Sequence, residues 1–372
     1  MSDRPYEAIY RRFRPATFDK VLGQRHVVNV LRAQIAAGNV PHAYLFSGTR
    51  GTGKTTMARL LAKGLNCLAE AADGRPCGVC ENCRSIQDGT FVDVIELDAA
   101  SNNGVDNIRE ITQVTVYPPT VGRKRVFIID EVHMLSNAAV NAFLKTLEEP
   151  PENTVFVLAT TEPGKLPATI RSRCLSFEFK RVPASVIAEG LGGIVSELGL
   201  SAAPDALALI AANADGSVRD ALSILEACVA AGGALDRSAV LEAVGSPGDE
   251  QIALLAAAVF GGRTAEALAA FGGMMQDGKE ARRVIEDWVD YLRSALLVRY
   301  LDKPEAILNR SLENIAAVRE QTAGIGEKRI TAQVRALSKL YNESRWSAQP
   351  GILVEMLIIE LSEDANLSIE KE

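Results

Sequence analysis

The sequence has no uninterrupted apolar run of about 18 residues, the length that a membrane-spanning helix needs. It also has no basic-then-apolar leader at its start, so we predict neither a membrane span nor a secretory signal and expect a cytoplasmic protein with no membrane partner. No internal repeats or low-complexity tracts stand out. A chain of 372 residues can build two or three domains without cross-links, so its six cysteines reflect chemistry and not a weak core.

Charge is distributed unevenly along the chain. The net charge is −7, but residues 1–180 carry 22 basic against 19 acidic side chains, whereas residues 181–372 carry 18 against 28. Binding to nucleic acid requires basic surface, so the first half is the better candidate for such contact. A difference of this size does not establish the contact by itself.

Short β-type runs alternate with helical patterns between residues 40 and 179. The runs are AYLFSG, FVDVIELD, KRVFIID, TVFVLATT and CLSFEF, and all are almost wholly apolar at their centres. Runs of this kind, separated by helix-length segments, are typical of a parallel sheet covered on both faces. We therefore predict an α/β fold in which residues 1–180 form a doubly wound, parallel-sheet nucleotide-binding domain.

Helical periodicity replaces the β-type runs from Pro183 onward. A second boundary is suggested at VGSPGDE, where Gly245, Pro247 and Gly248 separate two helical patterns. We therefore expect a small helical domain at 181–243 and an all-helical domain at 244–372.

The stretch GTRGTGKTT fits the phosphate-loop pattern G-x-x-x-x-G-K-[ST] and lies between an apolar strand and a helix. Its glycines let backbone N–H groups surround a phosphate at a helix N-terminus, where the helix dipole favours negative charge. Lys54 is expected to reach the β- and γ-phosphates, and Thr55 to ligate magnesium. The predicted nucleotide-binding residues of this loop are Gly48, Thr49, Arg50, Gly51, Thr52, Gly53, Lys54, Thr55 and Thr56.

An acidic pair, Asp130 and Glu131, follows the apolar run VFII. Beside a phosphate loop, Asp130 is expected to orient the magnesium ion and Glu131 to accept the proton of an attacking water. The two elements together predict hydrolysis of ATP or GTP, and not binding alone. We interpret His133, a lone histidine beside the pair, as a local structural residue.

Four cysteines follow the pattern C-x9-C-x2-C-x2-C, namely Cys67, Cys77, Cys80 and Cys83. In a reducing compartment such a cluster favours metal binding over disulfides, and four thiolates at this spacing suit a closed tetrahedral zinc site. Redox pairing and free thiols are the alternatives. Cys174 and Cys228 lie elsewhere in the sequence, and we expect them to be ordinary buried cysteines.

Five motifs in succession resemble the γ/τ family of bacterial DNA polymerase III subunits, the AAA+ ATPases of the sliding-clamp loader. The motifs are LFSGTRGTGKTTMARLLAKGLNC, DEVHMLS, FLKTLEEPP, LATTEPGKLPATIRSRC and GSVRDALS. The resemblance implies an AAA+ ATPase domain with an inserted zinc module near 67–83, a helical lid domain and an all-α collar domain that forms oligomers. It also implies ATP, magnesium and zinc as cofactors.

The same resemblance implies roles for single residues. Thr161 matches the first sensor of the γ-phosphate, and Arg219 matches the second sensor, which ties the lid to the nucleotide. Arg173, in the triplet SRC, matches an arginine that acts on the nucleotide of the adjacent subunit. The segment YRRFRPATFDKVLGQ resembles the one that covers the adenine. Base and ribose contacts are accordingly expected from Tyr10, Arg14, Pro15, Val21 and Leu22.

DNA contact is implied for Arg109 and Lys145, through phosphates and without sequence readout. Asn102 and Gly104 stand where some relatives carry basic residues, which lowers the predicted positive charge there, although both still offer backbone N–H groups. The implied function is loading of the sliding clamp onto primed DNA within the polymerase holoenzyme. The implied partners are the clamp-loader δ and δ′ subunits, further copies of the chain in a pentamer, the clamp and primed DNA.

Two other functions fit parts of the pattern. A different AAA+ machine, such as a branch-migration motor or a helicase loader, would share Lys54, Asp130 and Glu131 but is not expected to carry the cysteine insert or the SRC triplet. A nucleotide-gated scaffold with negligible hydrolysis is the second alternative, and an intact Glu131 and Arg173 argue against it as the sole role.

Overall fold

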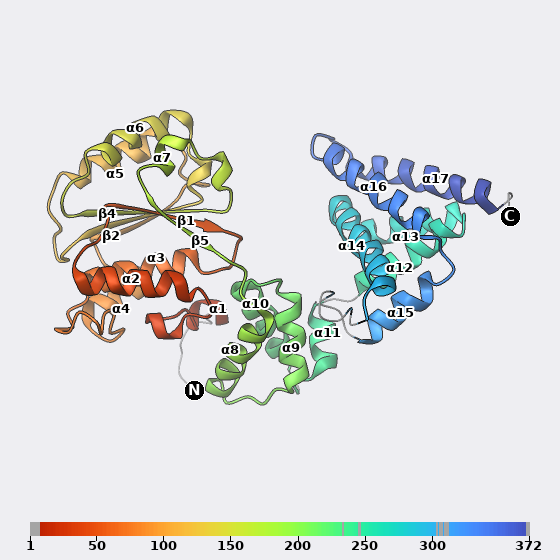
Figure 1. Cartoon of the computed structure of the whole chain (residues 1–372), viewed down its shortest axis with the longest axis horizontal. Helices are drawn as coiled ribbons and strands as arrows, with labels where there is room; N and C mark the ends of the chain where they lie inside the picture. The colour runs from red at the N-terminus through yellow and green to blue at the C-terminus, as the bar shows by residue number, and fades with distance from the viewer. Residues whose placement is uncertain are drawn as a thin grey trace. The chain divides into compact units, whose positions relative to one another are not determined.

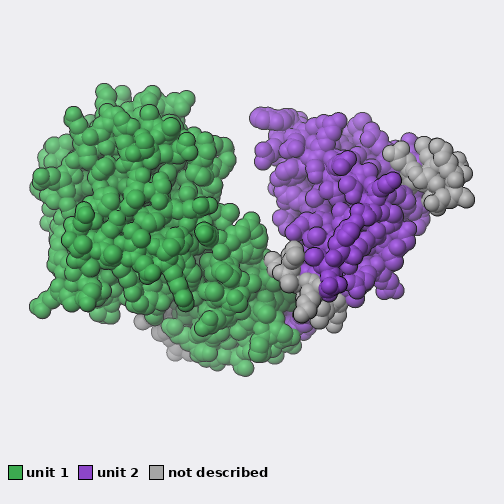
Figure 2. All heavy atoms as spheres, in the orientation of Figure 1, with its two compact units in different colours: residues 1–236 green, residues 237–372 purple. Residues whose placement is uncertain are grey.

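The computed structural model describes residues 8–232, 234–244, 247–302, 304, 308 and 312–369. The chain forms two compact units, residues 1–236 and residues 237–372 (Figure 2). Gly245 and Ser246, which belong to the second boundary predicted from the sequence, lie outside the described residues.

A five-stranded parallel sheet forms the centre of the first unit, with the strand order β2-β3-β4-β1-β5. The strands are β1 (Ala43–Gly48), β2 (Val94–Asp98), β3 (Arg125–Asp130), β4 (Thr154–Thr160) and β5 (Leu175–Phe179). Each lies within one of the five β-type runs, which confirms the α/β prediction. Because β1 pairs with both β4 and β5, the strand order reverses beside it, and doubly wound sheets bind ligands at the carboxyl ends of strands at such a point.

Helices cover both faces of this sheet (Figure 1). One face carries α2 (Arg25–Ala37), α3 (Lys54–Asn66) and α4 (Glu81–Asp88), and the other carries α5 (Val105–Thr115), α6 (Asn137–Glu148) and α7 (Ala168–Arg171). Alternate strand residues face opposite ways, so that Phe46 and Ile128 join the first apolar core and Leu45 and Ile129 the second. Burial on both faces explains why the strand centres are apolar throughout.

Helical structure follows the sheet within the first unit, as α8 (Ala184–Glu197), α9 (Pro204–Asn213) and α10 (Val218–Ala231). The short helix α1 (Ile9–Arg12) lies against α10, and the Ile9 N–H donates a hydrogen bond of 3.1 Å to Glu226 Oε1. The start of the chain is thereby joined to the helical part of this unit and not to the sheet alone.

The second unit is all-helical in its described residues. Its helices are α11 (Arg237–Val244), α12 (Pro247–Phe260), α13 (Thr264–Gln276), α14 (Ala281–Tyr300), α15 (Leu312–Thr322), α16 (Glu327–Ser344) and α17 (Pro350–Ile369). Helices α12 to α17 share one apolar core, in which Trp288 and Phe271 are almost fully buried. Among the described residues, no helix combines the length and the apolar character needed to cross a bilayer.

Candidate nucleotide and metal sites

The carboxyl ends of three neighbouring strands bring the predicted nucleotide-site residues to one edge of the sheet. The phosphate loop follows β1, the pair Asp130 and Glu131 closes β3, and Thr161 follows β4. Ser47 is in register with Thr160 across β1 and β4, so these ends lie level with each other.

The phosphate loop wraps around the side chain of Lys54, which is 6% exposed. Lys54 Nζ donates hydrogen bonds to Gly48 O (2.8 Å) and Thr49 O (3.0 Å), and Thr52 Oγ1 donates to Thr49 O (2.8 Å). Burial lowers the pKa of Lys54, and the nearby Glu131 and Asp130 partly oppose that shift. A buried ammonium at the N-terminus of α3 favours an anionic ligand here.

Thr55 and Asp130 meet at the mouth of this loop. Thr55 Oγ1 donates a 2.7 Å hydrogen bond to Asp130 Oδ2, while Asp130 Oδ1 accepts from the Glu131 N–H at 3.0 Å. A hydroxyl and a carboxylate are hard oxygen ligands of the kind that magnesium prefers beside phosphates. The donor set therefore fits the ion expected from the sequence.

Glu131 is held in an unusual backbone conformation, with φ 47° and ψ 45°. This left-handed region is sparsely populated by non-glycine residues and costs on the order of 1–3 kcal/mol where the surroundings enforce it. Its carboxylate Oε2 accepts hydrogen bonds from the N–H (3.1 Å) and Oγ1 (2.9 Å) of Thr161. The proposed base and the proposed sensor are thus in direct contact.

His133 lies closer to this chemistry than the sequence interpretation implied. Its side chain is 7% exposed, and its Nδ1 lies 3.3 Å from Glu131 Oε2 and 3.0 Å from Thr160 Oγ1. Its Nε2 lies 3.5 Å from Glu162 Oε1. The signal in the sequence is slight, because it is only the position of His133 in the one-turn helix η2 (Val132–Met134) directly after the acidic pair.

The N-terminus of α10 lies directly on the phosphate loop. The Val218 N–H donates to Gly51 O at 3.1 Å. Gly51 has φ 77°, and a Cβ there would lie 1.8 Å from Ser217 Oγ, so a side chain cannot be accommodated. Arg219 places its guanidinium carbon 4.9 Å from the centroid of the Tyr10 ring. Loop, helical domain and N-terminal segment therefore meet at one point.

Of the residues expected to contact the base, Tyr10 and Arg14 lie near Arg219. Arg14 has a lowered pKa, chiefly because it is buried and then because Arg59 lies near it. Leu22 packs against α8 at Gly190, where a Cβ would lie 2.4 Å from Leu22 Cδ1. Half-buried side chains in the same segment are Pro15, Val21 and Leu22. The predicted segment is accordingly a contact surface for α8 as well as a candidate cover for the base.

Arg173 lies after α7. Its guanidinium forms an ion pair with Glu148 (Nη2 to Oε1, 2.7 Å) and donates to Thr169 O (2.8 Å). Within the described residues, its side-chain hydrogen bonds are to α6, to α7 and to Ser172, the C-cap of α7, and none is to the phosphate loop of its own chain. This placement suits an arginine that acts elsewhere than on its own nucleotide.

The candidate DNA contacts lie on the opposite face of the sheet from α3 (Figure 1). Arg109 is an exposed residue of α5 and pairs with Asp106 at 3.2 Å, and Lys145 is exposed on the neighbouring α6. Asn102 is half-buried, and both its backbone N–H and its side-chain amide donate to Asp98 O. Gly104 is the N-cap of α5.

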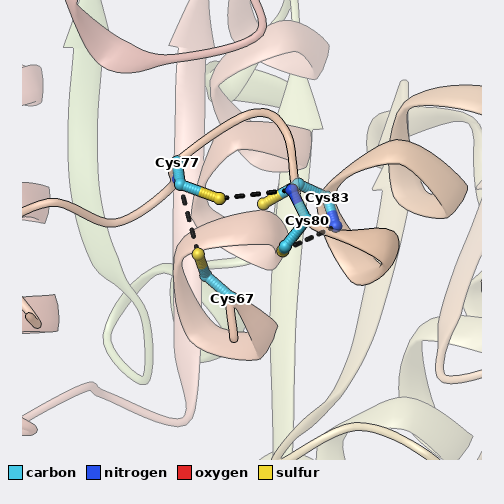
Figure 3. A group of neighbouring side chains, drawn as sticks. All are labelled: Cys67, Cys77, Cys80 and Cys83. Atoms are coloured by element: carbon cyan, nitrogen blue, oxygen red, sulfur yellow. Dashed lines mark hydrogen bonds between the residues drawn. The ribbon is translucent and has the colours of Figure 1, made fainter. Parts of the chain in front are cut away.

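The four clustered cysteines converge between the end of α3 and the start of α4 (Figure 3). Their Sγ atoms all lie within 4.8 Å of one another. Tetrahedral zinc with Zn–S bonds of about 2.3 Å needs sulfurs roughly 3.8 Å apart, so small adjustments would complete such a site. Backbone N–H groups of Cys77, Cys80 and Cys83 donate to sulfurs of the cluster at 3.4 Å.

Ionisation of the sulfurs is unequal. Burial raises the pKa of Cys67 and of Cys83, whereas at Cys77 burial is outweighed by N–H groups of Val79 and Cys80, which lower its pKa to about 6. The almost fully buried Lys63, which the sequence interpretation missed, adds positive charge near Cys83. A divalent cation would supply the further charge that four thiolates need.

The remaining two cysteines are unremarkable in their surroundings. Cys228 is buried, as expected, while Cys174 is only half-buried. Burial raises the pKa of Cys174 to about 12 and also raises that of Cys228. Both thiols are therefore protonated and unreactive near neutral pH.

Three protein-family models match the chain in succession. They are "DNA polymerase III, delta subunit" over residues 23–183, "DNA polymerase III clamp loader subunit, ATPase lid domain" over 186–234, and "DNA polymerase III subunits gamma and tau domain III" over 235–372. The matched regions follow the sheet domain, the three helices α8 to α10 and the second compact unit.

Curated relatives agree with these models. The DNA polymerase III subunit tau of Bacillus subtilis is 39% identical over 98% of this chain and 64% of its own length, and that of Escherichia coli is 50% identical over 66% and 38%. The chain thus spans less than two thirds of the length of these relatives. A solved structure of Thermotoga maritima RuvB overlays with a TM-score of 0.48 at 19% identity, covering 64% of this chain and 78% of that one. On the sequence matches, the chain belongs to the γ/τ family of DNA polymerase III subunits.

Proposed function

We propose that the chain is an ATP-hydrolysing subunit of the bacterial clamp loader and uses ATP to place the sliding clamp on primed DNA within the DNA polymerase III holoenzyme. The observation that carries the proposal is the meeting of Thr55, Asp130 and Glu131, with Thr161 on the Glu131 carboxylate. A phosphate loop that served binding alone would need no such carboxylate.

Each residue then has a defined task. Lys54 leaves the loop carbonyls and binds the β- and γ-phosphates, while Thr55 and Asp130 hold magnesium. Magnesium would neutralise charge that develops on the phosphates during transfer. Glu131 accepts the proton of the attacking water, and Thr161 orients that carboxylate at its present 2.9 Å. The strained backbone of Glu131 keeps the base at this position.

The helical domain reports on the nucleotide in this scheme. Arg219 moves from the ring of Tyr10 to the γ-phosphate when ATP binds, which changes the angle between sheet domain and lid. Tyr10, Arg14, Pro15, Val21 and Leu22 bind base and ribose. Arg173, whose guanidinium is bonded, within the described part of the chain, to Glu148 and Thr169 and not to its own loop, stabilises the transition state in a neighbouring subunit, an effect worth roughly 10³–10⁵ in rate in related systems.

Assembly and cofactor use follow the same proposal. Residues 1–180 are the ATPase domain, 181–243 the lid and 244–372 the collar through which δ, δ′ and further copies join a pentamer. Three exposed apolar residues one and two turns apart on α17, Ile352, Met356 and Ile359, suit such a contact. The cysteine cluster holds one structural zinc ion, and all four positions are filled by protein, so it has no catalytic part.

DNA contact in the proposal is electrostatic. Arg109 and Lys145 lie on adjacent helices and reach duplex phosphates, and the start of α5, whose N-cap is Gly104, offers backbone N–H groups. The Asn102 N–H is already bonded to Asp98 O and does not contribute. The sparse positive charge predicts weak, salt-sensitive contact. Charge reversal at Arg109 should lower DNA-stimulated ATPase activity and leave basal activity unchanged.

The decisive experiment is an ATPase assay of the chain alone and after reconstitution with δ, δ′, clamp and primed DNA. We expect low basal turnover that rises strongly with clamp and DNA together. Arg173→Ala should retain ATP binding and lose turnover only in the assembly. Turnover that does not respond to clamp and primed DNA would refute clamp loading, and normal turnover of the assembled Arg173→Ala complex would refute action in trans.

A further inference from the structure

Gln24 combines burial with an unfavourable backbone conformation, although nothing in the proposed reaction uses it. Gln24 is 7% exposed, and its backbone has φ 52° and ψ 27°. Residues other than glycine rarely adopt this left-handed backbone conformation, and they keep it only where surrounding contacts enforce it. Gln24 lies two residues after Leu22, and Val21 and Leu22 are expected to contact the base.

The Gln24 carboxamide joins three segments that are far apart in the sequence. Its Oε1 accepts from the Lys180 N–H (3.2 Å), and its Nε2 donates to Lys180 O (2.6 Å). Nε2 also donates to Thr52 O in the phosphate loop, at 3.4 Å. Both amide hydrogens are thus used, and the carboxamide has no donor left for another partner.

Lys180 begins the linker that leads from the sheet to the helical domain. β5 ends at Phe179 and α8 begins at Ala184. Farther along this linker, the Val182 N–H donates to Gly216 O, next to the start of α10. Because the Val218 N–H bonds to Gly51 O, the helical domain is attached to the phosphate loop twice, once at α10 and once through Gln24 and the linker.

We propose that Gln24 is a positioning residue that transmits the state of the phosphate loop to the linker and so to the helical domain. The inference rests on the proposed function, because it concerns ATP at that same loop. The two donor contacts differ in length, 2.6 Å to Lys180 O and 3.4 Å to Thr52 O. The linker is the fixed partner of the carboxamide, and the loop carbonyl is the partner that moves relative to it when phosphates fill the loop.

Two substitutions separate the roles of the carboxamide and of the backbone. Gln24→Glu keeps shape and the acceptor for the Lys180 N–H but places a carboxylate oxygen against two carbonyl oxygens. Gln24→Gly removes all three contacts while relieving the left-handed backbone. Gln34→Glu is the matched control, because Gln34 is half-buried on α2 and accepts one hydrogen bond from Tyr44 Oη, which a carboxylate also accepts.

Hydrogen exchange of the full chain, with and without a non-hydrolysable ATP analogue, gives the readout. In the wild type and in Gln34→Glu, the analogue should slow exchange in the loop (49–55), in the linker (180–182) and at 217–219. In both Gln24 variants the loop should still be protected. The analogue-dependent protection of 180–182 should fall about five- to tenfold, the effect of losing the one hydrogen bond, to Thr52 O, that joins the carboxamide to the loop.

Each other result has a definite meaning. Unchanged protection of the linker in both Gln24 variants would overturn the inference and leave the proposed function intact. Loss of loop protection in both variants would also overturn it, because Gln24 would then be a structural part of the loop. No loop protection in the wild type would refute the nucleotide site itself, and this inference with it.

Discussion

Strand β3 carries a polar cluster at each end, and the two clusters differ in how far their polar atoms are satisfied. At its start, Asp93 and Arg125 are 0% and 5% exposed. The Asp93 carboxylate accepts from the N–H groups of Thr120, Val121 and Gly122 and from Arg125 Nη2. Apart from Arg125 Nε, the nitrogens of that guanidinium are bonded to the carboxylate and to backbone carbonyls.

At the other end of β3, the polar groups are partly open. Glu131 is 31% exposed at its side chain, has a strained backbone and is held by Thr161 and His133. Asp130 meets Thr55 at the mouth of the phosphate loop. A polar cluster whose groups are nearly all hydrogen-bonded stabilises the loop that it contacts and fixes its conformation. A cluster that is partly open to solvent can exchange its contacts for a ligand. One strand thus has a structural end and a reactive end.

The largest effect should come from the reactive end. Glu131→Gln keeps the size of the side chain but removes the proposed base, and loss of a general base lowers turnover by about 10²–10⁴-fold. ATP affinity and the urea midpoint should stay close to the wild-type values. Steady-state ATPase activity of the reconstituted assembly measures turnover. ATP binding to the chain alone measures affinity, and urea unfolding of the chain measures stability. Normal turnover would show that another group accepts the proton.

The next largest effect should come from the structural end. Asp93→Asn replaces one carboxylate oxygen by an NH2 group, which cannot accept from the loop N–H groups that face it. It also leaves the Arg125 guanidinium buried without its carboxylate, which costs about 3–5 kcal/mol of unfolding free energy. Turnover per folded molecule should not change. Urea unfolding checks the loss, and the exposed Asp73→Asn serves as a control that should stay within about 0.5 kcal/mol of wild type. Equal stability of the two variants would contradict the assigned role.

The sequence predicts the reactive end far better than the structural one. The phosphate loop and the acidic pair are contiguous motifs, and five apolar runs place them at the carboxyl ends of strands. Asp93 and Arg125 are separated by 32 residues, and their pairing depends on how β2 and β3 lie together. No pattern in the sequence predicts such a contact.

Residues around the nucleotide site were missed for a related physical reason. His133 lies 3.3 Å from Glu131 and also contacts Thr160 at the end of β4, a neighbour that the sequence around the acidic pair does not reveal. Gln24 is marked by a left-handed φ that its residue type does not indicate. Motifs therefore identify groups that touch a ligand, whereas groups that hold them in place depend on neighbours brought together by folding.

Low pH should reduce the stability that the Asp93–Arg125 cluster contributes. Burial works to raise the pKa of Asp93, but the N–H groups of Gly122, Val121 and Thr120 and the Arg125 guanidinium outweigh it and lower the pKa below its ordinary 3.8. A lowered folded-state pKa gives stability that is complete above the unfolded-state pKa and is lost as the pH falls through the folded value. Urea midpoints from pH 7 down to about 3 should fall more steeply for wild type than for Asp93→Asn. Parallel curves would assign acid sensitivity to other carboxyls.

The smallest effect should come from loosening the reactive end without removing its base. Thr161→Val deletes the 2.9 Å hydroxyl contact to Glu131 Oε2 and keeps the backbone N–H contact at 3.1 Å. A hydrogen bond to a charged group is worth about 1.5–3 kcal/mol, so turnover should fall by about 10- to 150-fold.

The KM for ATP should stay unchanged in Thr161→Val. The hydroxyl positions the Glu131 carboxylate and is not among the groups expected to bind the adenine or ribose. The exposed Thr90→Val, whose hydroxyl bonds to Ser85 O, controls for loss of a threonine hydroxyl. The urea midpoint should change less than in Asp93→Asn, since Glu131 can turn to solvent whereas Arg125 cannot. A large loss of stability with unchanged turnover would instead make both ends of β3 structural.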